Sequence, residues 1–223
     1  MALSFAQTKV LKEILRPGMR IASMGYPDLI APIDDQPGLE YRADSEAICR
    51  RHGLSLRRIP DAESYFKLQD CTLDVYDIVR ERGCEVACDL NEKFTPPRLY
   101  DIVLDVGTVE HCFNIAQAMM NMAGMVKEGG YIIHENPFLM GNHGFYSLNP
   151  TFYHDFYESN GFKLMDCKLV TRNGRMAEIS PTGRFRYEGG ECNVFAMAKR
   201  TKIKSFVMPV QTKYAGSIPA AGV

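Results

Sequence analysis

Hydrophobic and polar positions alternate in blocks that predict strands followed by helices along most of the chain. The clearest block spans residues 100–137. It begins with the Val- and Ile-rich run YDIVLDV, has a polar break, and continues with apolar residues at helical spacing in IAQAMMNMAGMV. The Gly-Gly turn at 128–130 ends this helix before YIIHENP extends again. Such a unit is a right-handed crossover between parallel strands. Ligands bind beyond the carboxyl ends of such strands, where residues 107–111 and 134–137 are expected to converge.

The rest of the chain continues this alternation. We expect helices at 4–16, 45–52 and 73–82, and strands at 19–25, 54–60 (LSLRRIP) and 85–88. A helix opens at Asn149-Pro150, and two strands without a helix between them follow at 162–170 and 192–199. The predicted fold class is therefore α/β, a doubly wound, mostly parallel sheet with an antiparallel edge. Residues 1–200 are expected to form one domain, and 201–223 a C-terminal arm or disordered tail.

Composition excludes several classes of partner. The 26 Lys and Arg balance 27 Asp and Glu without a basic block, so no nucleic acid is expected as a partner. No apolar run is long enough for a bilayer and no signal peptide is evident, so no membrane partner is expected. Seven scattered cysteines favour reduced thiols and a cytoplasmic location. The oligomeric state stays open, with a homo-oligomer as one alternative.

Four short motifs between residues 85 and 162 occur in one order. They are the acidic loop CDLNE at 88–92, the strand YDIV at 100–103, the loop GTVEH at 107–111, and VKEGG at 126–130. Each motif alone is common, but the combination is specific. It resembles the second half of a class I S-adenosylmethionine-dependent methyltransferase. The resemblance implies a Rossmann-like fold, S-adenosylmethionine as the cofactor, and a transferase that moves a methyl group.

The resemblance also implies which residues contact the cofactor. The Asp89 carboxylate would accept from the adenine amine, and the Leu90 side chain would lie on the ring face. Asp61, or Glu63 in its place, would accept hydrogen bonds from the ribose hydroxyls, as the acidic residue after the second strand. The loop after the strand at 100–106 would approach the methionine part through Gly107 and Thr108, and Glu110 in the same loop would also contact the cofactor.

The loop after the first strand departs from the family pattern of an acidic residue followed by three spaced glycines. Ser23 occupies the acidic position, and Pro27, which has no N–H, occupies the second glycine position. Two interpretations follow. In one, the loop is rebuilt, with Gly25 allowing the close approach and Asp28 contacting the amino-acid end of the cofactor. In the other, cofactor binding is lost and the protein is a non-catalytic binding or scaffold protein.

Candidate catalytic residues lie in the loops beyond the predicted sheet. His143, in a Gly-Asn-His-Gly loop, is the candidate base, and Glu110 and Tyr146 are the alternatives. Methyl transfer depends mainly on in-line positioning, so a base helps without being obligatory. His134, Glu135 and His143 are candidate metal ligands, but their spacing fits no dependable ligand pair, so no metal is expected. The expected acceptor is the oxygen or nitrogen of a small molecule or glycan precursor.

Overall fold

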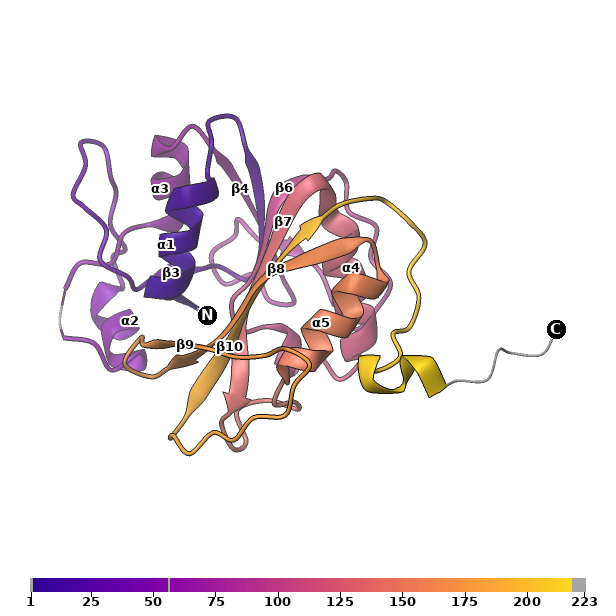
Figure 1. Cartoon of the computed structure of the whole chain (residues 1–223). Helices are drawn as coiled ribbons and strands as arrows, with labels where there is room; N and C mark the ends of the chain where they lie inside the picture. Colours follow the sequence, from indigo (N-terminus) through magenta and orange to yellow (C-terminus); the bar gives the residue numbers. More distant parts are fainter. Residues whose placement is uncertain (1, 56, 218–223) are drawn as a thin grey trace.

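A large twisted sheet runs through the middle of the molecule, with helices on both sides (Figure 1). In this computed structural model, which describes residues 2–55 and 57–217, eight strands form the sheet. They are β2 (Arg20–Met24), β4 (Thr72–Asp77), β5 (Val86–Ala87), β6 (Tyr100–Asp105), β7 (Val126–Leu139), β8 (Phe162–Thr171), β9 (Met176–Glu178) and β10 (Cys192–Arg200). Their order is β5-β4-β2-β6-β7-β10-β8-β9.

The direction of the strands confirms the predicted fold class. The pairs β5-β4, β4-β2, β2-β6 and β6-β7 are parallel, whereas β10 runs antiparallel to both β7 and β8. The predicted strands at 162–170 and 192–199 therefore form the antiparallel part of the sheet, with β9 added at its edge. A separate short parallel pair joins β1 (Ala2–Leu3) to β3 (Asp28–Leu29).

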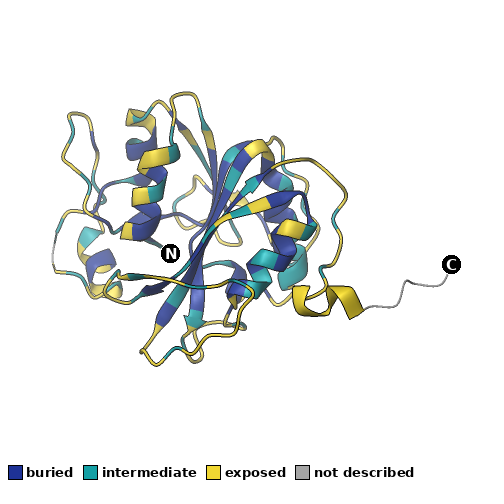
Figure 2. Ribbon diagram, in the orientation of Figure 1, coloured by how far each residue is buried: buried dark blue, intermediate teal, exposed yellow. Residues whose placement is uncertain are grey.

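Two layers of helices cover the sheet and bury its apolar faces (Figures 1 and 2). On one face lie α1 (Phe5–Ile14) and α3 (Ala62–Leu68), with α2 (Ser45–Arg51) at the periphery. On the other face lie α4 (Ile115–Met125) and α5 (Pro150–Ser159). Side chains alternate along the central strands, so that Ile102 packs beneath the first layer and Val103 beneath the second. Both faces are covered, which explains why these strands read as almost continuous apolar runs.

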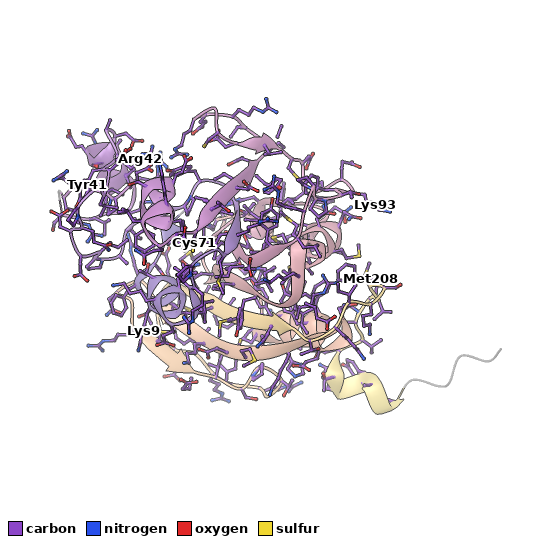
Figure 3. The ribbon with its side chains drawn as sticks, turned by 90° about the horizontal axis from the view of Figure 1, so that it is seen from above. Lys9, Tyr41, Arg42, Cys71, Lys93 and Met208 are labelled. Atoms are coloured by element: carbon purple, nitrogen blue, oxygen red, sulfur yellow. The ribbon has the colours of Figure 1, made fainter. Side chains whose placement is uncertain are left out.

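Two predicted elements in the first half were wrong. Residues 54–60 form no strand in the described part of the chain. Among the described residues of this range, Pro60 makes an isolated bridge to Tyr41, which lies with Arg42 at the edge of the molecule (Figure 3). A helix was predicted at 73–82, but Thr72–Asp77 form β4, paired with β2 in parallel register, and residues 78–82 form no helix. Val75 and Tyr76 face opposite sides of the sheet and are both buried, so long-range pairing overrides the local helical spacing.

The segment after β10 lies along α5. Val207 donates its N–H to Asn160 Oδ1 over 2.8 Å, and the Phe206 ring stacks on Phe156. It ends in the 3₁₀ helix η2 (Thr212–Ser217), whose first residue donates its N–H to Asp155.

The rest of the predicted tail, 218–223, lies outside the described residues. No helix in the described ranges has both the length and the apolar character needed to cross a membrane.

Candidate functional site

A cavity of about 640 Å³ opens at the carboxyl ends of the parallel strands. Its walls come from the ends of β4, β6 and β7, the segment after β5, and residues of the loop after β7. The size is typical of a small-molecule or cofactor site. Its position, beyond the strand ends of an open α/β sheet, is where this architecture binds ligands.

One side of the cavity carries carboxylates and apolar side chains. Asp89 and Leu90, the residues expected to hold the adenine, both line it. Leu90 is buried, whereas Asp89 is exposed and accepts from the Asn91 backbone and side-chain amides over 2.9 and 2.8 Å. Asp77, the last residue of β4, lies beside them and accepts from the Val79 N–H over 3.1 Å.

The residue predicted for the ribose is placed elsewhere. Asp61 does not follow the second strand. It is the N-cap of α3, where it accepts from the Ser64 N–H, and it also bonds to the Tyr26 hydroxyl. Neither Asp61 nor the alternative Glu63 is among the residues lining the cavity. The wrong second strand caused this error, since the strand that pairs with β2 ends at Asp77. The TLDVYD pattern, with a carboxylate at its end, was the signal that could have identified Asp77.

The loop after β2 does not reach the cavity directly. Gly25 has φ +79° and donates its N–H to the Tyr76 carbonyl oxygen, which ties the loop to β4. Asp28 is buried in β3, with the cationic groups of Arg51 and Arg82 each 3.7 Å from its carboxylate. His52 Nε2 lies 3.4 Å from the same carboxylate. Gly25 and Asp28 are absent from the cavity lining, whereas Arg51 and His52 belong to it.

The loop after β6 is held by a single buried carboxylate. Asp105 accepts from the N–H groups of Thr108 and Val109 over 3.0 and 3.2 Å, which closes the turn into the 3₁₀ helix η1 (Val109–His111). Gly107 has φ +92°, and a Cβ there would lie 3.3 Å from Glu110 Oε1. A side chain at Gly107 would therefore be both strained and crowded. Gly107, Thr108 and Glu110, the residues expected to approach the cofactor, all line the cavity.

A buried polar network supports this loop from behind. The second Asp105 oxygen bonds to His134 Nδ1 over 2.7 Å and to Asn136 Nδ2 over 3.0 Å. His134 Nε2 bonds in turn to the Tyr157 hydroxyl, and Asn136 Oδ1 accepts from the Tyr153 hydroxyl. All five side chains are buried, and both nitrogens of His134 are occupied. His134 is therefore a structural residue and not a ligand-binding one.

Glu110 lies above this network and faces two histidines. Its Oε2 accepts from Asn136 Nδ2 over 2.9 Å, whereas its buried Oε1 has no hydrogen-bond partner among the described residues. His143 Nε2 and His111 Nε2 lie 3.6 and 3.8 Å from Oε1. Burial, and then the nearby Asp105 charge, raise the pKa of the Glu110 carboxyl to about 7. Burial and the neighbouring His143 lower the pKa of His111.

The loop after β7 is fixed against Glu110. Phe145 donates its N–H to the Glu110 carbonyl oxygen over 2.9 Å, and a Cβ at Gly144 would come within 2.8 Å of that oxygen. Only glycine permits this approach, which holds His143 beside Glu110. Tyr146 instead donates to the Phe113 carbonyl oxygen and is absent from the cavity lining. The structure thus assembles Glu110, His111 and His143 (the Glu-His cluster). His111 was not among the predicted site residues, although it adjoins Glu110 in the same motif.

Comparison with known proteins identifies the fold. No family model matches the chain, and no curated protein matches it in sequence. Among solved structures it is similar to a Burkholderia thailandensis 1,6-didemethyltoxoflavin-N1-methyltransferase bound to 1,6-didemethyltoxoflavin and S-adenosylhomocysteine. The TM-score is 0.51 at 13% identity, covering 87% of this chain and 76% of that chain. It is also similar to TehB from Haemophilus influenzae, with a TM-score of 0.54 at 9% identity, covering 89% of this chain and 62% of that one. This chain thus spans less than two thirds of TehB. The chain has the class I methyltransferase fold.

Proposed function

We propose that the protein transfers a methyl group from S-adenosylmethionine to an oxygen or nitrogen atom of a small molecule. The observation that carries the proposal is the single cavity that joins Asp77 and Leu90 at one end to the Glu-His cluster at the other. Asp77 and Leu90 are suited to bind the ribose and adenine of a nucleoside, and the Glu-His cluster is suited to accept a proton. A glycan precursor is retained as one acceptor class to test.

The residues of the cavity fit this cofactor. Leu90 presents an aliphatic surface for the adenine, and Asp77 is positioned to accept from the ribose hydroxyls. Arg51 and His52 line the cavity near the rebuilt first loop and carry groups suited to a carboxylate. Asp28 lies behind these two side chains, so its inferred role is to orient them instead of contacting the cofactor.

The chemistry follows from the charges at the far end of the cavity. The cofactor, when bound, supplies a methyl group on a positively charged sulfur. The acceptor atom takes that methyl while the electron pair of the broken carbon–sulfur bond stays on sulfur. The acceptor's proton passes to the Glu-His cluster. His143 is exposed enough to meet an acceptor, and ionised Glu110 beside it would stabilise the imidazolium formed.

Asp77→Ala is expected to weaken binding of S-adenosylhomocysteine about 5- to 150-fold, equivalent to losing about 1–3 kcal/mol of hydrogen bonding to the ribose. Isothermal titration calorimetry of the wild type and the variant measures this. Asp34→Asn, at an exposed position outside the cavity lining, is the matched control and should bind as the wild type does.

The outcomes of this titration separate the two main functional classes. Wild-type binding that Asp77→Ala leaves unchanged would remove Asp77 from the site. Failure of the wild type to bind at high micromolar cofactor would instead favour the non-catalytic alternative. The specific observation behind that alternative is the first loop, where Pro27 replaces a glycine and Gly25 does not line the cavity.

A further inference from the structure

We propose that the Glu-His cluster binds a divalent transition-metal ion at the acceptor end of the cavity. One carboxylate oxygen and one nitrogen from each histidine all lie within 4.8 Å of one another. Metal–ligand bonds of about 2.0–2.2 Å place two ligands of one ion at most about 4.4 Å apart. The 3.6 and 3.8 Å separations between Glu110 Oε1 and the two Nε2 atoms already meet that limit.

The second observation is the orphaned oxygen of Glu110. The side chain is fully buried, and its Oε1 points at the two imidazoles without a hydrogen-bond partner in the described residues. A buried carboxylate oxygen left unpaired is costly, and a bound cation removes that cost. The Asn136 amide holds the other oxygen, as outer-shell partners of metal-binding carboxylates do.

The ligand set also selects the class of metal. Two imidazole nitrogens with one carboxylate suit Mn²⁺, Fe²⁺, Co²⁺, Ni²⁺ or Zn²⁺, whereas Mg²⁺ and Ca²⁺ prefer oxygen ligands. This proposal departs from the expectation of no metal, which considered a different set of residues. His134 is occupied by Asp105 and Tyr157, and Glu135 by Ser4 and Asn193.

Three protein ligands leave coordination positions open for the acceptor. With the ion bound, His143 is a ligand and no longer takes the acceptor's proton. A hydroxyl oxygen bound to the ion would instead lose its proton to solvent at a lower pH than in water, which prepares it for methylation. The inferred acceptor class is therefore a hydroxyl compound that can bind a metal ion through oxygen. This part of the inference rests on the proposed function, whereas metal binding by the cluster does not.

The test is a titration of the full chain, treated with chelator and then dialysed, with Co²⁺ alone. We expect one Co²⁺ per chain, with visible absorption bands typical of nitrogen and oxygen ligands. Glu110→Gln, His111→Gln and His143→Gln should each weaken binding roughly 10- to 100-fold. His154→Gln, outside the cavity lining, is the matched control and should bind as the wild type does.

Several results would overturn the proposal. They are no Co²⁺ binding, wild-type affinity in both histidine variants, equal loss in the control, or intense thiolate-to-cobalt bands that assign the ion to cysteines. His111 and His143 are about half exposed, so their variants should fold even if Glu110→Gln does not. The assay contains no cofactor. Loss of S-adenosylhomocysteine binding with Co²⁺ binding intact would therefore refute only the proposed function.

Discussion

Replacing His143 by alanine is expected to lower turnover roughly 10²–10⁴-fold and to leave the affinity for S-adenosylhomocysteine almost unchanged. The imidazole is held 3.6 Å from Glu110 Oε1 by a loop that docks on the Glu110 backbone. Its loss removes either the group that takes the acceptor's proton or a ligand of the proposed metal ion. Steady-state kinetics measures the turnover, and calorimetry on the same preparations measures the affinity for S-adenosylhomocysteine. His154→Ala, outside the cavity lining, is the control and should retain wild-type turnover.

The pH dependence of the wild-type rate belongs to the same prediction. The Glu110 carboxyl has its pKa raised to about 7, so it is neutral below that pH and ionised above it. Only the ionised form stabilises an imidazolium. The rate of the metal-free protein is therefore expected to rise with pH up to about 7 and then level off. Near-normal turnover in His143→Ala would show that the chemistry needs positioning alone. A rate that does not change with pH would show that ionisation of Glu110 plays no part in the reaction.

The second large effect is expected on stability, from Asp105→Ala. Asp105 is fully buried and accepts from two backbone N–H groups and from the side chains of His134 and Asn136. The substitution leaves these donors without an acceptor, because the site is closed to water. We expect the free energy of unfolding to fall by about 3–5 kcal/mol. Chemical denaturation followed by circular dichroism measures it.

Asp34→Ala is the control for this experiment, since its carboxylate is exposed, and its stability should match the wild type within about 0.5 kcal/mol. If Asp105→Ala lowers the free energy of unfolding by no more than the control does, the buried polar network around Asp105 does not hold the loop at 107–111. The Asp105 variant should also lose the turn at 107–111, so cofactor affinity is expected to fall with stability.

The second half of the fold could be predicted because its signals are local. The strand at 100–105 and the helix at 115–125 follow each other closely, although the helix ends at Met125 and the Gly-Gly pair predicted to stop it lies within β7. In the first half, Leu73, Val75 and Tyr76 fit either a helix or a strand when considered alone. Pairing with β2, about fifty residues away, decides between them, and a short window contains no trace of that pairing.

The candidate site shows the same difference between local sequence signals and long-range contacts. Asp89, Leu90 and the 107–110 loop were predicted because they lie in motifs that are contiguous in sequence. Asp77 was missed because its strand was missed. The pairing of His143 with Glu110 depends on Gly144, whose missing Cβ lets two loops touch. Such a contact joins residues more than thirty positions apart, so only the folded chain reveals it.

The proposed function places S-adenosylmethionine in the cavity with its transferable methyl group directed at the Glu-His cluster. The most direct test is nuclear magnetic resonance of the chelator-treated protein with cofactor carrying a ¹³C-labelled methyl group. We predict nuclear Overhauser effects from that methyl to the ring protons of His143. His143→Ala should remove these signals and retain those from the adenine to Leu90. Absence of binding, or methyl contacts confined to residues away from the cluster, would contradict the claim.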